Sequence, residues 1–157
     1  MTKTAIAIGG NTGNVAATFA AAMRLLTEAG LRQLRHSNWL RTAPVDCAPG
    51  TADFLNGALT GDWPGDARTL LRCCQAIEER CGRPAEHGVN QPRTLDLDLI
   101  LFGEECCHSD ELTLPHPRAR QRRFVLAPLA EIAADWRFPD SGESVAACLA
   151  RLPAESA

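Results

Sequence analysis

The chain has 157 residues, of which 45% are apolar and 22% are charged, and this length and composition predict one compact domain over residues 1–157. Its 16 basic and 19 acidic residues give a formal net charge of −3, which argues against a general polyanion binder but leaves a local anion site open. Only Lys3 is a lysine, so arginine dominates the basic residues. Two explanations of this excess are codon bias and the ability of the planar guanidinium group to make bidentate contacts to carboxylates and phosphates.

The seven cysteines do not predict a disulfide framework or a zinc site. Cys73-Cys74 and Cys106-Cys107 are adjacent pairs, which lack the two-residue spacing that lets two thiolates bind one zinc, and an odd number leaves one thiol over. The N-terminal apolar run is too short for a signal peptide, and no segment approaches the roughly 18 apolar residues of a membrane span. We therefore expect a cytoplasmic protein without a membrane partner, in which most cysteines are small buried hydrophobic residues.

The first part of the chain predicts three strands and one helix. Apolar and β-branched runs that stop at glycine or proline indicate strands, and apolar residues at a helical spacing between a capping residue and a glycine indicate a helix. The predicted elements are a strand over 4–8, a helix from an Asn14 cap to Gly30, a strand over 31–42, a loop over 44–51 and a strand over 54–63.

The second part predicts one more strand of the main sheet, a short strand and three helices. These are a helix from an Asp66 cap to Cys81, a loop over 82–92, strands over 94–103 and 112–114, and helices over 124–134 and 144–152. The resulting order is an α+β, ferredoxin-like βαββαβ arrangement: an antiparallel sheet with helices packed on one face, followed by a C-terminal helical extension.

Asp96 and Asp98 are the first candidates for chemistry. Polarity alternates from Leu95 to Asp98, so a strand turns both aspartates to one face and the leucines to the other. Residues two apart on a strand lie roughly 6–7 Å apart at Cα. Two carboxylates at this spacing suit one or two Mg²⁺ ions whose coordination is completed by phosphate oxygens. A solvated polar strand face is the other interpretation of the pattern.

Basic residues precede and follow these aspartates. They are Arg83, Arg93, His116, Arg118, Arg120, Arg122 and Arg123. Carboxylates that hold a metal, beside guanidinium groups that neutralise phosphate oxygens, are what transfer of a phosphate-bearing group requires. Arginine at a helix N-terminus opposes the helix dipole, which a nearby anion would relieve, although a solvated helix start also accounts for the run.

The glycine-rich turn after the first strand is not a known phosphate-binding loop. Gly9-Gly10-Asn11-Thr12-Gly13 lacks both the GK[ST] ending of a P-loop and the spacing of GxGxxG. We expect a tight turn in which Asn11 makes a polar contact to a ligand.

One stretch carries a specific resemblance. Residues 92–103, which read PRTLDLDLILFG, resemble the signature of the 6-hydroxymethyl-7,8-dihydropterin pyrophosphokinase family of folate biosynthesis. Further stretches agree with the family in collinear order over about residues 4–140. They are Ile8-Gly9-Gly10-Asn11, Arg41-Thr42-Ala43-Pro44, Phe54-Leu55-Asn56, Leu114-Pro115-His116-Pro117-Arg118 and residues 122–129.

The resemblance implies a kinase that transfers the β,γ-diphosphate of ATP to the hydroxymethyl group of a reduced pterin and releases AMP. It implies two Mg²⁺ ions on Asp96 and Asp98, and catalytic roles for these two residues and for Arg83 and Arg93. The implied nucleotide-binding residues are Gln75, Glu78, Arg83, Arg93, Leu99, Thr113, His116 and Arg122. The implied pterin-binding residues are Asn11, Thr42, Ala43, Val45, Phe54, Asn56 and Phe124, with the pterin between the two phenylalanine rings. Core packing is the alternative interpretation of those rings.

The chain departs from the family before the signature proline. Asn90 and Gln91 stand where the family usually has a tryptophan and a glycine of a mobile covering loop, and Ala85 and Val89 replace arginines of that loop. A weaker cover lowers rate more than it affects the fold. The alternative is therefore a paralogue that binds nucleotide and a pterin-like ligand but acts on another substrate or only weakly.

Two other classes are disfavoured. An RNA-binding module of this fold needs exposed aromatic residues and a basic balance, whereas the chain has 5% aromatic residues and no tyrosine. A zinc or thiol site is also disfavoured, and metal analysis that found stoichiometric zinc would overturn this interpretation. We expect a monomer whose partners are small molecules and not nucleic acid.

Overall fold

The computed structural model describes residues 1–43, 53–81 and 95–153. In chain order these residues form β1 (Thr2–Gly10), α1 (Val15–Ala29), β2 (Arg32–His36), β3 (Leu40–Thr42), β4 (Phe54–Trp63), α2 (Ala67–Arg80), β5 (Asp96–Phe102), β6 (Cys107–His108), β7 (Thr113–Leu114), the 3₁₀ turn η1 (Ala119–Gln121), α3 (Arg123–Ala133) and α4 (Val145–Arg151). The predicted helices and the strand over 54–63 are confirmed.

Helix boundaries follow from capping side chains. The side chains of Asn14, Asp66 and Ser144 each accept a hydrogen bond from a backbone N–H in the first turn of α1, α2 and α4, which satisfies a donor that the helix itself leaves unpaired. Gly30 ends α1 at a φ of 124°, a conformation that favours glycine.

The main sheet is antiparallel, with the strand order β2-β4-β1-β5 and β3 paired beside β2 on β4. β1 lies between β4 and β5 and pairs with both. The predicted single strand over 31–42 is wrong in detail, because the chain leaves the ladder between β2 and β3. There the Ser37 hydroxyl accepts the N–H of Ala58, and the ring of Trp39 lies against Gly57.

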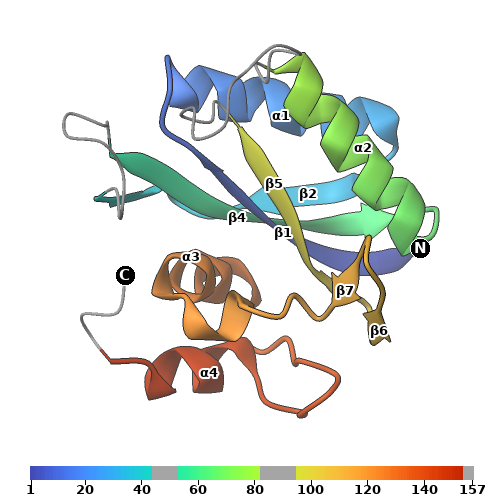
Figure 1. Ribbon diagram of the computed structural model, residues 1–157, viewed down its shortest axis with the longest axis vertical. Helices are drawn as coiled ribbons and strands as arrows, with labels where there is room; N and C mark the ends of the chain where they lie inside the picture. Colours follow the sequence, from blue (N-terminus) through green and yellow to red (C-terminus); the bar gives the residue numbers. More distant parts are fainter. Residues whose placement is uncertain (44–52, 82–94, 154–157) are drawn as a thin grey trace.

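The helices lie on both faces of the sheet, and the two helices of the predicted βαββαβ order, α1 and α2, share one face. α1 and α2 cover one face, and α3 with α4 covers the other (Figure 1). The reason is that both sheet faces are apolar: Ile6, Ile8 and Leu59 belong to the core with α1 and α2, while Ala5 and Ala58 belong to the core with α3 and α4.

The cysteines are less buried than predicted. Cys74 and Cys148 are buried in the two cores, whereas Cys106 and Cys107 are exposed near the β6–β7 hairpin. Six cysteines of the described segments are free thiols. None of the helices within residues 1–43, 53–81 and 95–153 has the length and hydropathy needed to cross a bilayer.

Candidate active site

The two faces of β5 differ as the alternation predicted. Leu95, Leu97 and Leu99 are buried in the core beneath α1 and α2, whereas Asp96 and Asp98 line a pocket on the face that α3 covers. The alternation ends at a bulge: Ala5 pairs with Leu101 and the next residue of β1 pairs with Leu99. Ile100 is therefore an extra residue, and it packs toward α3.

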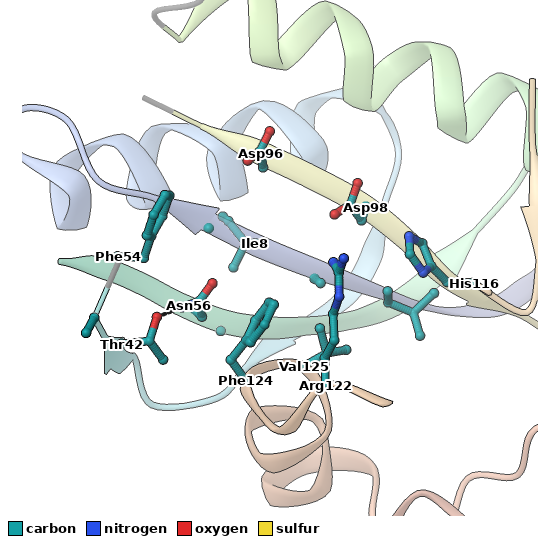
Figure 2. Close-up of a pocket in the computed structure, with 15 residues that line it drawn as sticks. Ile8, Thr42, Phe54, Asn56, Asp96, Asp98, His116, Arg122, Phe124 and Val125 are labelled. Carbon is teal, nitrogen blue, oxygen red and sulfur yellow. Dashed lines mark hydrogen bonds between the residues drawn. The ribbon is translucent and has the colours of Figure 1, made fainter. Parts of the chain in front are cut away.

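The pocket has a volume of about 280 Å³ and brings together four strands and the start of α3. Figure 2 shows its side chains, with Phe54, Asn56 and Thr42 toward one end and Asp98, His116 and Arg122 toward the other. Most of the predicted site residues that are described lie here. They are Thr42, Ala43, Phe54, Asn56, Asp96, Asp98, His116, Arg122 and Phe124.

An aromatic and amide group forms the first end of the pocket. Phe54 comes from β4 and Phe124 from α3, and both rings reach into the same space (Figure 2). The Nδ2 of Asn56 donates a hydrogen bond to Thr42 Oγ1 at 2.9 Å, because β3 and β4 pair in a register that sets Thr42 opposite Phe54. This contact fixes the orientation of the amide, so Asn56 presents a defined acceptor and donor.

Gly9 forms the floor between the two ends. It is paired with Asn56 on one side and with Asp96 on the other. A Cβ at Gly9 would lie 3.0 Å from Asn56 Oδ1, which is closer than ordinary contact. The absence of a side chain at Gly9 therefore leaves room for the Asn56 amide over the central strand, which pairs with Asp96 on its other side.

His116 is held as a neutral hydrogen-bond donor at the second end. The backbone N–H of Arg118 donates to His116 Nδ1 at 3.2 Å, so the proton of the neutral ring is on Nε2. Burial lowers the pKa of His116; the Asp98 carboxylate raises it, and Arg122 and Arg118 lower it further. The net pKa is below the ordinary value of 6.5, so the ring is neutral at pH 7.

Arg122 supplies the positive charge of the described pocket. It precedes α3, its guanidinium lies 5.5 Å from the centroid of the Phe124 ring, and it points toward Asp98 (Figure 2). A guanidinium over an aromatic face is held in place by attraction to the ring. Arg122 therefore extends from the helix start across the pocket toward the aspartates.

Other arginines of the same run have structural partners. Both terminal nitrogens of Arg120 donate to the Asp140 carboxylate at 2.6 Å, and Arg123 donates to the backbone oxygens of Leu152 and Pro153. Asp140 of the protein itself therefore neutralises part of the positive charge of this segment. Of the arginines in the run, Arg122 lines the pocket, whereas Arg120 and Arg123 have structural partners.

The remaining predicted residues lie elsewhere. Leu99 packs in the core beneath α1 and α2, Gln75 is exposed on α2, and Thr113 is on β7. Asn11 is buried directly after β1, and its Oδ1 accepts a hydrogen bond from Thr12. Glu78 is buried and contacts the backbone of β5. The ligand contacts of Leu99, Gln75, Thr113, Asn11 and Glu78 stay predictions.

The other predicted residues lie outside the described residues. They are Val45, Arg83, Arg93 and the altered loop residues Ala85, Val89, Asn90 and Gln91.

The sequence reasoning missed several residues of the pocket wall. They are Ala7, Ile8, Gly9, Gly57, Ile100 and Val125. Ala7 and Gly9 occupy alternate positions of β1, as the two aspartates do on β5. Small residues at every second position could therefore have indicated that this face of β1 borders a cavity. They could not have indicated that β1 pairs with β5.

The donor set of the pocket fits a hard divalent cation. Two carboxylates share one strand face and line one cavity, and Mg²⁺ takes one or two carboxylates together with phosphate and water oxygens. Within the described segments, no group of three or more His, Cys, Asp or Glu side chains is arranged to hold a metal ion. A cation on the two aspartates would therefore need further oxygens from a bound phosphate compound or water.

Comparison with known proteins identifies the family. Residues 5–134 match the model of the 7,8-dihydro-6-hydroxymethylpterin-pyrophosphokinase family, and the chain belongs to that family. It is 39% identical over 141 residues to the 2-amino-4-hydroxy-6-hydroxymethyldihydropteridine pyrophosphokinase of Synechocystis, covering 89% of this chain and 71% of that protein. The protein of the same name from Methylorubrum extorquens is 36% identical over 156 residues, which cover 97% and 94% of the two chains.

Solved structures agree in fold. The HPPK-DHPS of Plasmodium falciparum crystallised with pteroate superposes with a TM-score of 0.72 at 11% identity, over 96% of this chain and 44% of that one. The chain also matches the folate synthesis bifunctional protein of Arabidopsis thaliana at 39% identity but spans only 26% of it. At 11% identity the structural likeness shows the fold alone, an α+β arrangement of an antiparallel sheet and helices.

Proposed function

We propose that this chain is a pyrophosphokinase that transfers the β,γ-diphosphate of ATP to the hydroxymethyl group of 6-hydroxymethyl-7,8-dihydropterin, a step of folate biosynthesis. One observation carries the proposal: a pocket with an aromatic and amide end and a carboxylate, histidine and arginine end, in a chain that belongs to the pyrophosphokinase family. The relatives that carry this activity in their names favour it over the alternative of a paralogue with another substrate.

The pterin would bind at the first end. A flat, polar heterocycle between Phe54 and Phe124 buries both of its faces, and stacking on aromatic rings stabilises it. The Asn56 amide, fixed by Thr42, would pair with the hydrogen-bonding edge of the pterin. Asn11, Ala43 and Val45 are proposed contacts on the resemblance of their motifs.

The triphosphate would bind at the second end. The carboxylates of Asp96 and Asp98 would hold Mg²⁺, two ions by resemblance, which neutralise phosphate charge and lower the pKa of the attacking hydroxyl when bound. Arg122 would neutralise non-bridging oxygens, and His116 would donate from Nε2. Arg83 and Arg93 are proposed to act on the same phosphates. Gln75, Leu99 and Thr113 are the proposed nucleotide contacts, whereas Glu78, whose buried carboxylate accepts the Leu97 N–H, is proposed to act on this end through the β5 backbone.

The bonding changes follow from this placement. The hydroxymethyl oxygen of the pterin bonds to the β-phosphorus, and the bond from that phosphorus to the oxygen bridging to the α-phosphate breaks. AMP leaves with the bridging electron pair, and the hydroxyl proton is lost to water. Holding both substrates in one pocket supplies the in-line geometry of the step.

The finer fold description is also proposed. The strand order β2-β4-β1-β5 with α1 and α2 on one face supports a ferredoxin-like core to which α3 and α4 are added as a C-terminal helical extension. Residues 1–157 would then form one pyrophosphokinase domain. Action as a cytoplasmic monomer without a nucleic-acid partner remains a prediction from composition.

The test is AMP formation with the purified chain. ATP and Mg²⁺ are incubated with and without hydroxymethyl-dihydropterin, and AMP is separated from ADP. The proposal predicts AMP only when pterin is present. Measurable ATP binding without pterin-dependent AMP would instead support the paralogue.

A further inference from the structure

The buried side chain of Glu78 contacts β5 between the two aspartates. Glu78 lies on α2 and is 7% exposed, and its Oε2 accepts a hydrogen bond of 2.8 Å from the backbone N–H of Leu97. Leu97 is the residue that separates Asp96 from Asp98. Helix α2 thus contacts the backbone of β5 at the one position that is next to both aspartates.

The position of β5 in the sheet explains why this N–H needs a side-chain acceptor. β5 is the last strand in the order and pairs only with β1 among the described strands. Alternate N–H groups of such a strand point away from its neighbour. A buried N–H without an acceptor is unfavourable, and Glu78 supplies the acceptor from the adjoining helix.

The outer edge of β5 is held a second time, beyond Asp98. The backbone N–H of His116 donates to the carbonyl oxygen of Ile100 at 3.0 Å, at the bulge. Two contacts therefore hold this edge on either side of Asp98, one from Glu78 and one from the segment that carries His116. The first also fixes the peptide unit between Asp96 and Leu97, whose plane is rigid.

We propose that Glu78 is a positioning residue: by accepting the Leu97 N–H, it fixes the backbone between Asp96 and Asp98 and so directs both carboxylates into the pocket for a divalent cation. This inference rests on the proposed function, in which the two aspartates hold Mg²⁺. Groups that orient metal ligands typically change metal affinity by about 10- to 100-fold when they are altered.

Two substitutions separate the reach of the side chain from its charge. Glu78→Gln keeps the length and an oxygen acceptor but removes the charge. Glu78→Asp keeps the charge but is one methylene shorter, so its oxygen no longer reaches the Leu97 N–H. A positioning role predicts that the glutamine variant resembles the wild type and that the aspartate variant is impaired, whereas a purely electrostatic role predicts the reverse.

Thr4→Val provides the matched control. Thr4 is fully buried, and its Oγ1 donates to the carbonyl oxygen of Leu101 at 2.9 Å. This is a second buried side-chain contact to the β5 backbone, on the far side of the bulge from Asp96. Its loss lowers stability without moving the aspartates, so it measures the general cost of loosening β5.

Two readouts test the proposal on the folded chain. The first is the exchange rate of the Leu97 amide hydrogen, followed by NMR in the metal-free protein. The second is the dissociation constant of Mn²⁺ in the presence of α,β-methylene-ATP, in which the bond to be broken is blocked. We expect Glu78→Asp to exchange the Leu97 hydrogen about tenfold faster and to bind Mn²⁺ about tenfold more weakly, on the scale of an altered ligand-orienting group. Glu78→Gln and Thr4→Val should stay within about threefold of the wild type in both.

Each contrary result has a distinct meaning. Faster Leu97 exchange with unchanged Mn²⁺ affinity in Glu78→Asp would overturn the positioning role and leave a structural one. Unchanged Leu97 exchange in that variant, or weaker Mn²⁺ binding in Glu78→Gln than in Glu78→Asp, would also overturn it. Absence of Mn²⁺ binding by the wild type would refute the proposed metal role and this inference with it, whereas the other results refute the inference alone.

Discussion

The two faces of the sheet are built from the same strands but differ in what they enclose. Beneath α1 and α2, leucine and isoleucine side chains form a closed core. On the α3 side, the core occupies only part of the face, and a polar pocket occupies the rest. Because successive strand residues alternate between faces, neighbours such as Leu97 and Asp98 serve stability and chemistry separately.

The face beneath α1 and α2, here called the closed face, explains why the open face, which faces α3 and holds the pocket, tolerates polar groups. Its buried apolar side chains stabilise the strands, so the other face can place carboxylates and an amide beside a cavity. Substitutions one residue apart on a strand should therefore give opposite phenotypes: lost activity with a stable fold, or lost stability with the site chemistry intact. The following experiments test that contrast.

Asp98→Asn should have the largest effect. It removes a charged ligand from the open face without adding volume, so we expect kcat/KM for pterin-dependent AMP formation to fall about 1000-fold, with an unchanged midpoint of thermal unfolding. Steady-state kinetics and calorimetry measure the two quantities. Retained activity in this variant would remove the metal-binding role from Asp98.

Leu97→Ala should affect the closed face instead. Leu97 is 4% exposed in the core beneath α1 and α2, and truncating a buried leucine costs about 3 kcal/mol through lost contacts and a cavity. Urea unfolding gives the change in the free energy of unfolding. An unchanged free energy would contradict the assignment of this residue to the core.

Asn56→Ala should weaken pterin binding. It removes the amide that Thr42 orients, and a lost hydrogen bond in a buried site corresponds to about a 10- to 100-fold rise in the KM for pterin. The KM for ATP should change little. Equal changes in both constants would show that Asn56 does not distinguish the two ends of the pocket.

The adjacent Gly57→Ala variant is the counterpart on the closed face. A Cβ at Gly57 would overlap the ring of Trp39, so the ring must shift and disturb its edge contact with Phe19, which has a centroid distance of 5.0 Å. We expect a loss of about 1–3 kcal/mol in stability from overpacking. Wild-type stability in this variant would mean that Trp39 moves aside at no cost.

Asp140→Asn should have the smallest effect, because its ion pair is partly exposed. The hydrogen bond from Arg120 lowers the pKa of Asp140 below its ordinary value of 3.8. The pair therefore stabilises the fold above that value, and the stabilisation is lost as the pH falls through the lowered pKa. Unfolding at several pH values should show a difference from the wild type of at most about 1 kcal/mol near neutrality, vanishing in strong acid. A difference that grows in acid would contradict the assignment.

Local patterns predicted most of the elements and nine of the fifteen residues that line the pocket. The alternation from Leu95 to Asp98 predicted which face each residue occupies, and the predicted caps Asn14 and Asp66 accept nearby backbone N–H groups. These features depend only on residues close in sequence.

Features that depend on distant pairing were not predictable. The bulge at Ile100 arises from the register of β5 on β1, and Thr42 meets Asn56 only because β3 pairs with β4. Amphipathic helices show that a face is buried but not which side of the sheet buries it, so the side that α3 and α4 occupy was not predicted. Charge alone could not separate Arg122, in the pocket, from Arg120, paired with Asp140.

The most direct test of the account is phosphorus NMR of a reaction containing the chain, ATP, Mg²⁺ and hydroxymethyl-dihydropterin. The account predicts AMP and a pterin diphosphate ester in equal amounts, both absent from the reaction with Asp98→Asn. Formation of ADP with a pterin monophosphate, or of orthophosphate from ATP with the pterin unchanged, would contradict transfer of an intact diphosphate on the open face of the sheet.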